Sequence, residues 1–335
     1  MKKSFSLILA AALFCASCGK NPSYVRTSGF AQGTTWHITY KSFDKEDLTP
    51  KFDSILKAFD FSMSSYNKES RLTKLNENST DEIDENFAAV FASSEYLYKL
   101  SGGLFDPTCR PLVNAWGFNK HKDLKKPQQS ELDSILEFVG MDKVKVEDGR
   151  LKKTDPRLTL NFNANAQGYS VDLLCMWLKG RGYEDFLVEV GGEVRAFGKN
   201  SEAQPWRVGI DTPIDGSTEN DREISAAVPL ENKSLCTSGD YRNFFVIDGK
   251  KYSHELNPKT GYPKDDSLLS VSVVTPDALF GDGLATAVMV LGLEKGFKLV
   301  DSLPEAEGFF IYSDKNGNFK TLKTKGFEYF DITKP

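Results

Sequence analysis

Residues 34–40 read Thr-Thr-Trp-His-Ile-Thr-Tyr. This stretch, with the strands and helices predicted around it, decides the fold class. Trp36, Ile38 and Tyr40 alternate with polar Thr and His side chains. Strict alternation over a short run is typical of a strand with one buried face. Residues 186–190 read as a second short strand, which ends at Gly191-Gly192.

Helical spacing appears between and after these strands. Apolar side chains recur every three or four positions, which predicts helices over residues 52–63, 87–97 and 278–291. A further helix is predicted over residues 130–139, with Ser130 and Asp133 at its start and Gly140 as its stop. Strands and helices of this kind, with neither repeats nor a low-complexity linker, indicate an α+β fold in one continuous unit.

The second half of the chain adds more strand signals. A hairpin is predicted around Asp248-Gly249, a dipeptide that favours the tight turn between paired strands. The other predicted strands cover residues 268–274 and 309–312. Mixed sheets are therefore expected.

The N-terminus is a targeting segment. Lys2 and Lys3 precede an apolar run over residues 5–14, which is too short to span a bilayer and suits a signal peptide. The following Cys15-Ala16-Ser17-Cys18 resembles a bacterial lipobox, which implies a signal peptide over 1–17, lipid on Cys18 and a tether over 18–28. The alternative is an ordinary secretory signal.

Composition excludes other classes of function. The 335 residues carry 42 basic and 47 acidic side chains, for a net charge of −5, so no basic field is available for nucleic acid. Beyond Cys18 the chain has Cys109, Cys175 and Cys236, an odd number without CxxC spacing. This excludes the usual zinc motifs and allows at most one disulfide.

Chemistry-bearing residues gather in a few segments. Gly-rich turns and helix N-termini suit phosphate groups, and Tyr66, Trp116 and Phe118 offer rings that could stack on a flat ligand. Singly, each of these aromatic residues would be assigned to the core. Together they indicate a site for an anionic, aromatic ligand.

A metal site is predicted near the C-terminal helix. Asp282 and Thr286 are four residues apart, so they share a helix face and present oxygen ligands suited to Mg²⁺. His254 is the one histidine that lies among Ser, Asn, Pro, Thr and Gly residues. A pair of oxygen ligands is more often a solvated face, and a lone histidine is more often structural.

In combination these segments resemble the ApbE-type proteins, the FAD:protein FMN transferases. The match extends over roughly residues 29–291, and its most specific motifs are 167–172, 238–242, His254 with 257–261, and Asp282 with Thr286. The resemblance implies a single ApbE-type domain over 29–335, in which a flavin cleft lies between two halves.

The resemblance also implies a reaction. Such an enzyme cleaves the FAD pyrophosphate with Mg²⁺, moves FMN onto a threonine hydroxyl of an exported protein, and releases AMP. The implied acceptors are subunits of the sodium-translocating NADH:quinone oxidoreductase or of Rnf-type complexes, in which the threonine lies in a Ser/Thr/Gly-rich motif. The enzyme would be anchored to the membrane by Cys18 and face the periplasm.

Roles for single residues follow from the same resemblance. Asp282, Thr286 and the carbonyl of Ala164 would bind Mg²⁺, and His254 would remove the proton of the acceptor threonine. The alternative for His254 is that it orients a phosphate. Asp240 and Arg242 would either support the site or form a structural ion pair. The residues expected to bind FAD are Gln32, Tyr66, Trp116, Gly117, Phe118, Asn161 and Gln167.

The chain departs from the family pattern at several site positions. Asn161 and Asn257 stand where the family commonly has Asp, and Gln167 stands where it commonly has Lys or Glu. Asn163-Ala164 replaces a Gly-Gly step. Amides retain hydrogen bonds but carry no charge, so these changes are interpreted as a subfamily variation.

Two other functions stay open at this stage. The same pocket could hydrolyse FAD to FMN and AMP, as a Mg²⁺-dependent pyrophosphatase in which water replaces the acceptor. A function of another class is a flavin-binding lipoprotein without catalysis. Replacing His254 would leave the properties of such a binding protein unchanged.

Overall fold

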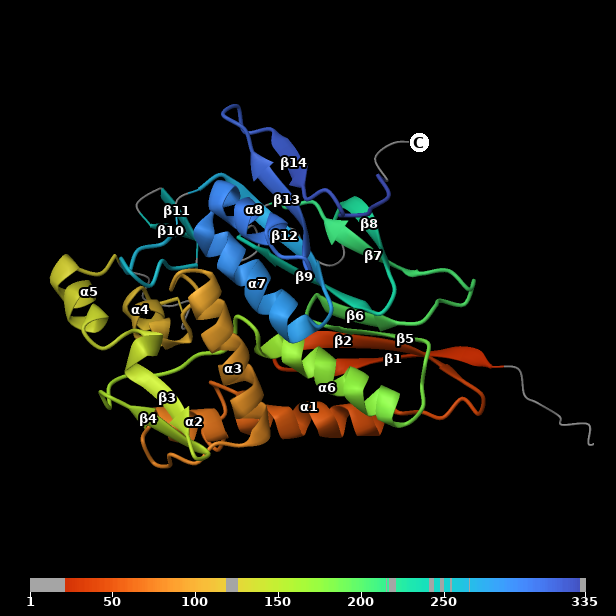
Figure 1. Ribbon diagram of the computed structural model, residues 1–335, viewed down its shortest axis with the longest axis horizontal. Helices are drawn as coiled ribbons and strands as arrows, with labels where there is room; N and C mark the ends of the chain where they lie inside the picture. Colours follow the sequence, from red (N-terminus) through yellow and green to blue (C-terminus); the bar gives the residue numbers. More distant parts are fainter. Residues whose placement is uncertain are drawn as a thin grey trace, which may run out of the picture.

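The computed structural model describes residues 22–118, 126–214, 216, 221–240, 244–247, 250–253, 255–264 and 266–331 (Figure 1). For residues 244–247 and 250–253 it describes the backbone alone. The predicted signal peptide over 1–17, Cys18 and His254 therefore lie outside the described residues. The same holds for Arg242.

The described part of the chain is built on one eight-stranded sheet with three small hairpins beside it. The order in the sheet is β1 (Ser23–Ala31), β2 (Thr34–Ser42), β5 (Phe186–Val190), β6 (Glu193–Phe197), β9 (Lys233–Gly239), β12 (Leu268–Thr275), β13 (Glu307–Ser313) and β14 (Phe319–Lys323). The hairpins pair β3 (Val144–Glu147) with β4 (Arg150–Lys153), β7 (Trp206–Asp211) with β8 (Ile224–Leu230), and β10 (Phe244–Ile247) with β11 (Lys250–Ser253).

Helices cover one side of the sheet and form a second lobe beside it (Figure 1). They are α1 (Thr49–Met63), α2 (Arg71–Asn76), α3 (Glu85–Leu100), α4 (Arg110–Ala115), α5 (Gln129–Leu136), α6 (Ala166–Gly180), α7 (Ala278–Leu291) and α8 (Leu293–Asp301). Short 3₁₀ turns occupy Pro107–Cys109 and Met141–Lys143.

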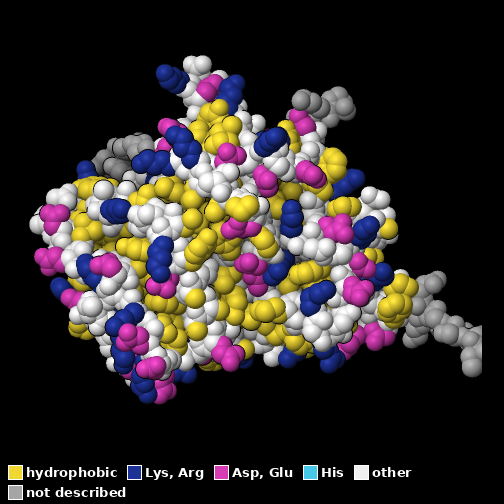
Figure 2. All heavy atoms as spheres, in the orientation of Figure 1, with side chains coloured by type: hydrophobic (Ala, Val, Ile, Leu, Met, Phe, Trp, Pro, Cys, Tyr) yellow, Lys and Arg dark blue, Asp and Glu magenta, His cyan; other side chains and the backbone are white. Residues whose placement is uncertain are grey.

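Separate apolar clusters hold these layers together. The largest lies where the inner face of the sheet, including Trp36 and Val188, meets α6 and α7. A second cluster closes the other face with the β7–β8 hairpin. A third joins α1, α2 and α3 to the β3–β4 hairpin. Charged side chains of both signs are interspersed on the face in Figure 2, as the small net charge leads one to expect.

Helices α6 and α7 meet at a glycine. Gly168 faces the backbone of α7 so closely that a Cβ atom there would clash with the carbonyl oxygen of Ala278. One turn further on, the buried Asp172 carboxylate accepts hydrogen bonds from the backbone N–H groups of Ala278 (3.0 Å) and Leu279 (2.8 Å). Arg195 on β6 donates to the same carboxylate at 2.6 Å. The start of α7 is thereby tied to both α6 and the sheet.

The structure confirms the α+β class and most predicted elements. The predicted strand over 34–40 lies in β2 with Trp36, Ile38 and Tyr40 buried, and the predicted helix over 278–291 coincides with α7. One difference concerns the sheets, because every described strand pair is antiparallel instead of mixed. The three cysteines after Cys18 are free thiols.

The predicted helix over 130–139 is α5, whose start was predicted to within one residue and whose end was not. The helix begins at Gln129, so Ser130 lies inside its first turn, and the Gln128 side chain at the cap makes no capping bond. It ends at Leu136, well before Gly140. The Val139 N–H still donates to the Ile135 carbonyl, and Gly140 has a φ of 139°. The ammonium group of Lys143 donates to the carbonyls of Leu136, Glu137 and Val139 and so satisfies acceptors that the helix end leaves free.

Among the described residues, no helix is both long enough and apolar enough to cross a membrane.

The α6–α7 contact predicts a contrast between two glycines of the same helix. Gly168→Ala should lower the free energy of unfolding by about 1–3 kcal/mol, because the added methyl forces the helices apart. Gly180→Ala meets no atom within 4 Å and should be neutral or stabilising by up to about 1 kcal/mol. Urea unfolding of both variants checks this, and equal effects would contradict it.

Candidate active site

A cavity of about 1120 Å³ lies between the end of β1, one face of α1 and the start of α6. Consecutive residues 29–33 line it, although successive side chains of a strand point to opposite faces. The cavity must therefore run along the edge and tip of the β1–β2 hairpin. Its other lining residues are Asp53, Leu56, Lys57, Phe59, Asp60, Met63, Ser64, Ser65, Tyr66, Asn67, Asn163, Ala166 and Gln167.

The β1–β2 turn carries a polar group without a partner. Gln32 and Gly33 form the turn with positive φ angles of 55° and 78°, as the favoured two-residue hairpin turn requires. The amide nitrogen Nε2 of Gln32 is buried and makes no hydrogen bond. Such an orphaned donor costs about 1–3 kcal/mol, so it is a group that a bound ligand could satisfy.

The loop after α1 presents an exposed aromatic ring. Tyr66 lines the cavity and is 75% exposed, so its ring face is available for stacking. The hydroxyl of Ser64 accepts the backbone N–H groups of Tyr66 (3.2 Å) and Asn67 (3.0 Å). The guanidinium of Arg110 donates to the Ser65 carbonyl at 3.3 Å. The loop is thus supported from two sides.

Oxygen atoms from α7 and from the loop before α6 converge beside the cavity. Thr286 Oγ1 donates to the carbonyl oxygen of Ala164 at 3.3 Å, and Ala164 lies between the cavity residues Asn163 and Ala166. Asp282, one helical turn before Thr286, accepts the Gly168 N–H at 2.8 Å. The predicted metal ligands Ala164, Asp282 and Thr286 therefore come together.

This set of atoms fits Mg²⁺. A carboxylate, a hydroxyl and a carbonyl are hard oxygen donors. Mg²⁺ bonds of about 2.1 Å place neighbouring ligands of an octahedron ~3.0 Å apart, close to the Thr286–Ala164 separation of 3.3 Å. Within the described ranges, no three His, Cys, Asp or Glu side chains gather into a metal cluster. A cation here must therefore use backbone and hydroxyl oxygens as well.

Burial changes the pKa values of two acids near these oxygen atoms. Desolvation raises the pKa of Asp282 well above its usual value, the charge of Glu193 adds to the rise, and the Gly168 N–H opposes it. Desolvation also raises the pKa of Glu193, to about 8. Two acidic groups thus lie close together in an apolar environment.

Three of the predicted FAD ligands take a different position. The rings of Trp116 (0% exposed) and Phe118 (5% exposed) stack on each other inside an apolar cluster with Leu112, Leu132 and Leu256. The Trp116 indole N–H donates to the Gly261 carbonyl at 2.7 Å. Stacking of these rings on a ligand was therefore a wrong expectation, because they join α4 to the 255–263 segment. Gly117 between the two rings has a φ of 78°, and its N–H donates to the Asn114 carbonyl at 3.0 Å.

The other predicted site residues divide into groups. Gln32, Tyr66 and Gln167 line the one cavity, and Gln167 lies against Gly191 at the β5–β6 turn. The side chain of Asn161 accepts the Asn163 N–H at 3.0 Å, so it shapes the loop that carries Ala164. His254 lies outside the described residues, and its role stays a prediction, as do the binding roles of the others.

Sequence reasoning missed three supporting residues. Glu193 follows Gly191-Gly192 and is buried, as are the apolar Val190 and Val194 on either side. An acid among apolar strand residues could have been recognised from the sequence as a candidate site residue. Asp172 belongs to a quoted motif, but only the fold shows that it caps α7. Arg110 had no sequence signal, because its contact is with a distant loop.

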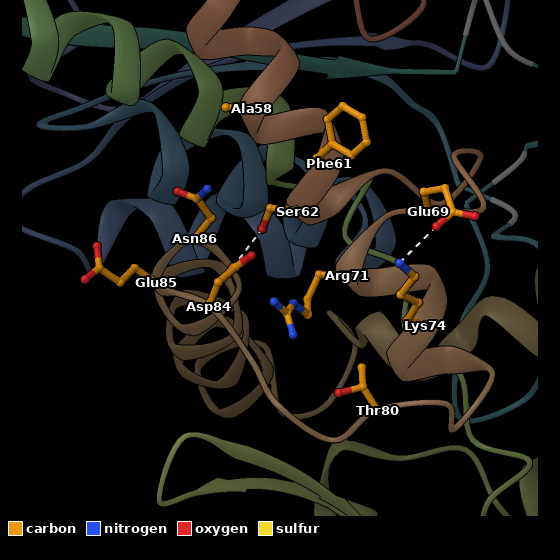
Figure 3. Close-up of a pocket in the computed structure, with 10 residues that line it drawn as sticks. All are labelled: Ala58, Phe61, Ser62, Glu69, Arg71, Lys74, Thr80, Asp84, Glu85 and Asn86. Carbon is orange, nitrogen blue, oxygen red and sulfur yellow. Dashed lines mark hydrogen bonds and ion pairs between the residues drawn. The ribbon is translucent and has the colours of Figure 1, made fainter.

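A second hollow of about 650 Å³ opens on the other face of α1, between α2 and the start of α3 (Figure 3). Its polar groups largely satisfy one another. Ser62 donates to Asp84 at 2.8 Å, and Lys74 pairs with Glu69 at 3.0 Å. This hollow contains none of the predicted site residues.

Comparison with known proteins defines the class. A family model described as "ApbE family" matches residues 32–310, which is most of the chain. The protein belongs to the ApbE family. The match includes the cavity-lining residues from Gln32 onward and the oxygen donors beside the cavity.

Individual relatives support the assignment. The chain is 35% identical to the FAD:protein FMN transferase of Haemophilus influenzae, over 100% of both chains. It is 32% identical to the protein of that name in Escherichia coli K12, over 99% of both. Among solved structures, the flavin transferase ApbE of Vibrio cholerae superimposes with a TM-score of 0.81 at 30% identity, covering 92% of this chain and 99% of that one. The apo flavinyl transferase ApbE of Pseudomonas stutzeri gives 0.81 at 32%, covering 91% and 95%.

The buried position of Trp116 yields a test. Trp116→Phe keeps an aromatic ring but leaves the Gly261 carbonyl without its donor, so the free energy of unfolding should fall by about 1–3 kcal/mol. FAD affinity, measured by flavin fluorescence, should stay unchanged because the ring does not face the ligand. A large loss of affinity without loss of stability would restore the stacking role.

Proposed function

We propose that the protein transfers FMN from FAD to a threonine hydroxyl of another protein and releases AMP. Support comes from family membership and from full-length relatives that carry the name FAD:protein FMN transferase. The observation that carries the proposal is the juxtaposition of a large cavity with three hard oxygen donors at Ala164, Asp282 and Thr286.

The reaction requires few covalent steps. The threonine oxygen attacks the phosphorus on the FMN side, the bond from that phosphorus to the bridging oxygen breaks, and AMP leaves with that oxygen. The hydroxyl proton passes to His254, the proposed base. Bound Mg²⁺ would neutralise charge on the pyrophosphate, which is its general contribution to phosphoryl chemistry.

Different residues of the cavity would contact different parts of FAD. Tyr66 offers a ring face, while the Gln32 and Gln167 amides can donate to and accept from a heterocycle edge. Asn161 holds the loop on which Ala164 lies. Tyr66, Gln32 and Gln167 are neutral, and the lining carries Lys57 against two acids, Asp53 and Asp60. A bound cation would therefore supply the positive charge that faces the pyrophosphate of FAD.

The cellular setting is part of the proposal. Lipid on Cys18 would hold the enzyme at the membrane with its catalytic domain on the periplasmic side, where a lipobox-type signal would deliver it. The acceptor would be an exported subunit of a sodium-translocating NADH:quinone oxidoreductase or an Rnf-type complex. Its threonine would lie in a Ser/Thr/Gly-rich motif.

One structural feature favours FAD hydrolysis as a second candidate. Tyr66 at the cavity is largely exposed to solvent, so water can approach the site when no acceptor covers it. Hydrolysis would then be the slower side reaction of the same machinery.

The test combines mature protein, FAD and Mg²⁺ with a short acceptor that carries the threonine motif. Intact-mass spectrometry should find one FMN added to the acceptor with the wild type. Asp282→Asn should reduce the rate at least 100-fold, because the cation loses its charged ligand. Asp301→Asn, an exposed acid at the end of α8, is the matched control and should react normally.

The other outcomes are equally informative. Release of AMP and FMN without modified acceptor would replace the transferase by the pyrophosphatase. FAD bound but unchanged in every sample would show a flavin-binding protein. Full activity of Asp282→Asn would remove the metal site from the mechanism.

A further inference from the structure

Glu193 is a buried acid for which the proposed reaction has no role so far. It opens β6 directly after the Gly191-Gly192 turn, and its side chain is 6% exposed. One carboxylate oxygen, Oε2, is fully buried and has no hydrogen-bond partner. Buried carboxylates are rarely left so unless something absent from the protein chain compensates them.

The surroundings of Glu193 point toward the cation site. Its carboxyl lies beside the thiol of Cys236 and the backbone N–H of Thr237, on neighbouring β9. Cys236 packs against α7 at Gly281, the residue before Asp282. Glu193 is also near enough to Asp282 for its charge to raise the pKa of that carboxyl.

Among the residues that the structure describes, no basic side chain pairs with either of these acids. Arg195 is on the same strand, but its guanidinium is bonded to Asp172 at 2.6 Å. Among the described residues, neither Glu193 nor Asp282 forms an ion pair. Two like charges in a low-dielectric environment repel strongly, and a divalent cation is the simplest group that removes both costs.

We propose that Glu193 is the second carboxylate of the cation site, so that Asp282 and Glu193 together supply the two negative charges that a divalent ion neutralises. The inference rests on the proposed cation site but not on the transfer reaction. It assigns Glu193 to ion affinity, whereas Thr286 and Ala164 supply neutral oxygens. The ligand of this site would be a small, hard divalent cation such as Mg²⁺ or Mn²⁺.

The test measures binding of Mn²⁺ alone, by electron paramagnetic resonance of the free ion, without FAD or acceptor. Glu193→Gln keeps the shape of the side chain but removes its charge, and should weaken Mn²⁺ binding by roughly 10–100-fold. Glu294→Gln changes the net charge equally at an exposed position on α8 and should bind like the wild type. Glu193→Ala, which lacks the carboxylate altogether, should weaken Mn²⁺ binding to a similar extent.

Thermal unfolding in EDTA separates this role from a structural one. With the cation removed, Glu193→Gln should melt no lower than the wild type, because the amide keeps the shape of the side chain and carries no charge to bury. Added Mg²⁺ should raise the Tm of this variant less than that of the wild type. Wild-type Mn²⁺ affinity in Glu193→Gln, with or without a lower Tm in EDTA, would overturn the proposal. If the wild type binds no Mn²⁺, the cation site itself fails, and with it the metal in the proposed function.

Discussion

The contact between α6 and α7 at Gly168 is the constraint on which the rest of the site depends. Without a side chain, Gly168 lets the Ala278 carbonyl approach, and its own N–H reaches the Asp282 carboxylate at 2.8 Å. Asp172 completes the junction by capping α7. The helix that carries the acidic ligand is therefore placed by the helix that borders the cavity, so that binding and chemistry share one rigid element.

Charge is the second organising feature. The cavity is lined by amides at Gln32, Asn67, Asn163 and Gln167, and the acids nearest the cation site are buried. The lining also holds Lys57 with Asp53 and Asp60, so it offers no net positive charge. Such a cavity beside a buried pair of carboxylates is poorly suited to bind a pyrophosphate by itself. The cavity becomes suitable once a divalent cation lies between the protein and the phosphates, because the carboxylates and the phosphates then both attract the cation.

The local elements were largely predictable from residue patterns. Strand β2 follows from the alternation of Trp36, Ile38 and Tyr40, and α7 from helical spacing. The end of α5 was not, and the carbonyls left free there are satisfied by Lys143 from a later turn of the chain. Trp116 illustrates the same limit of local patterns for the site. An aromatic residue in a Gly-containing motif suits both ligand stacking and core packing, and the burial that decides between them is a property of the fold.

By itself, the sequence determined the class of fold, the family and the residue types for an anionic, aromatic ligand with a hard cation. These properties depend on composition, short-range periodicity and motifs, which are local. The tertiary structure alone decided which of those residues meet. Ala164 lies against Thr286 from a segment more than a hundred residues away, and Glu193 on β6 is near enough to Asp282 on α7 for its charge to raise the pKa of that carboxyl. Such contacts are set by packing between distant segments, and no local pattern encodes the distance between two side chains that only the folded chain brings together.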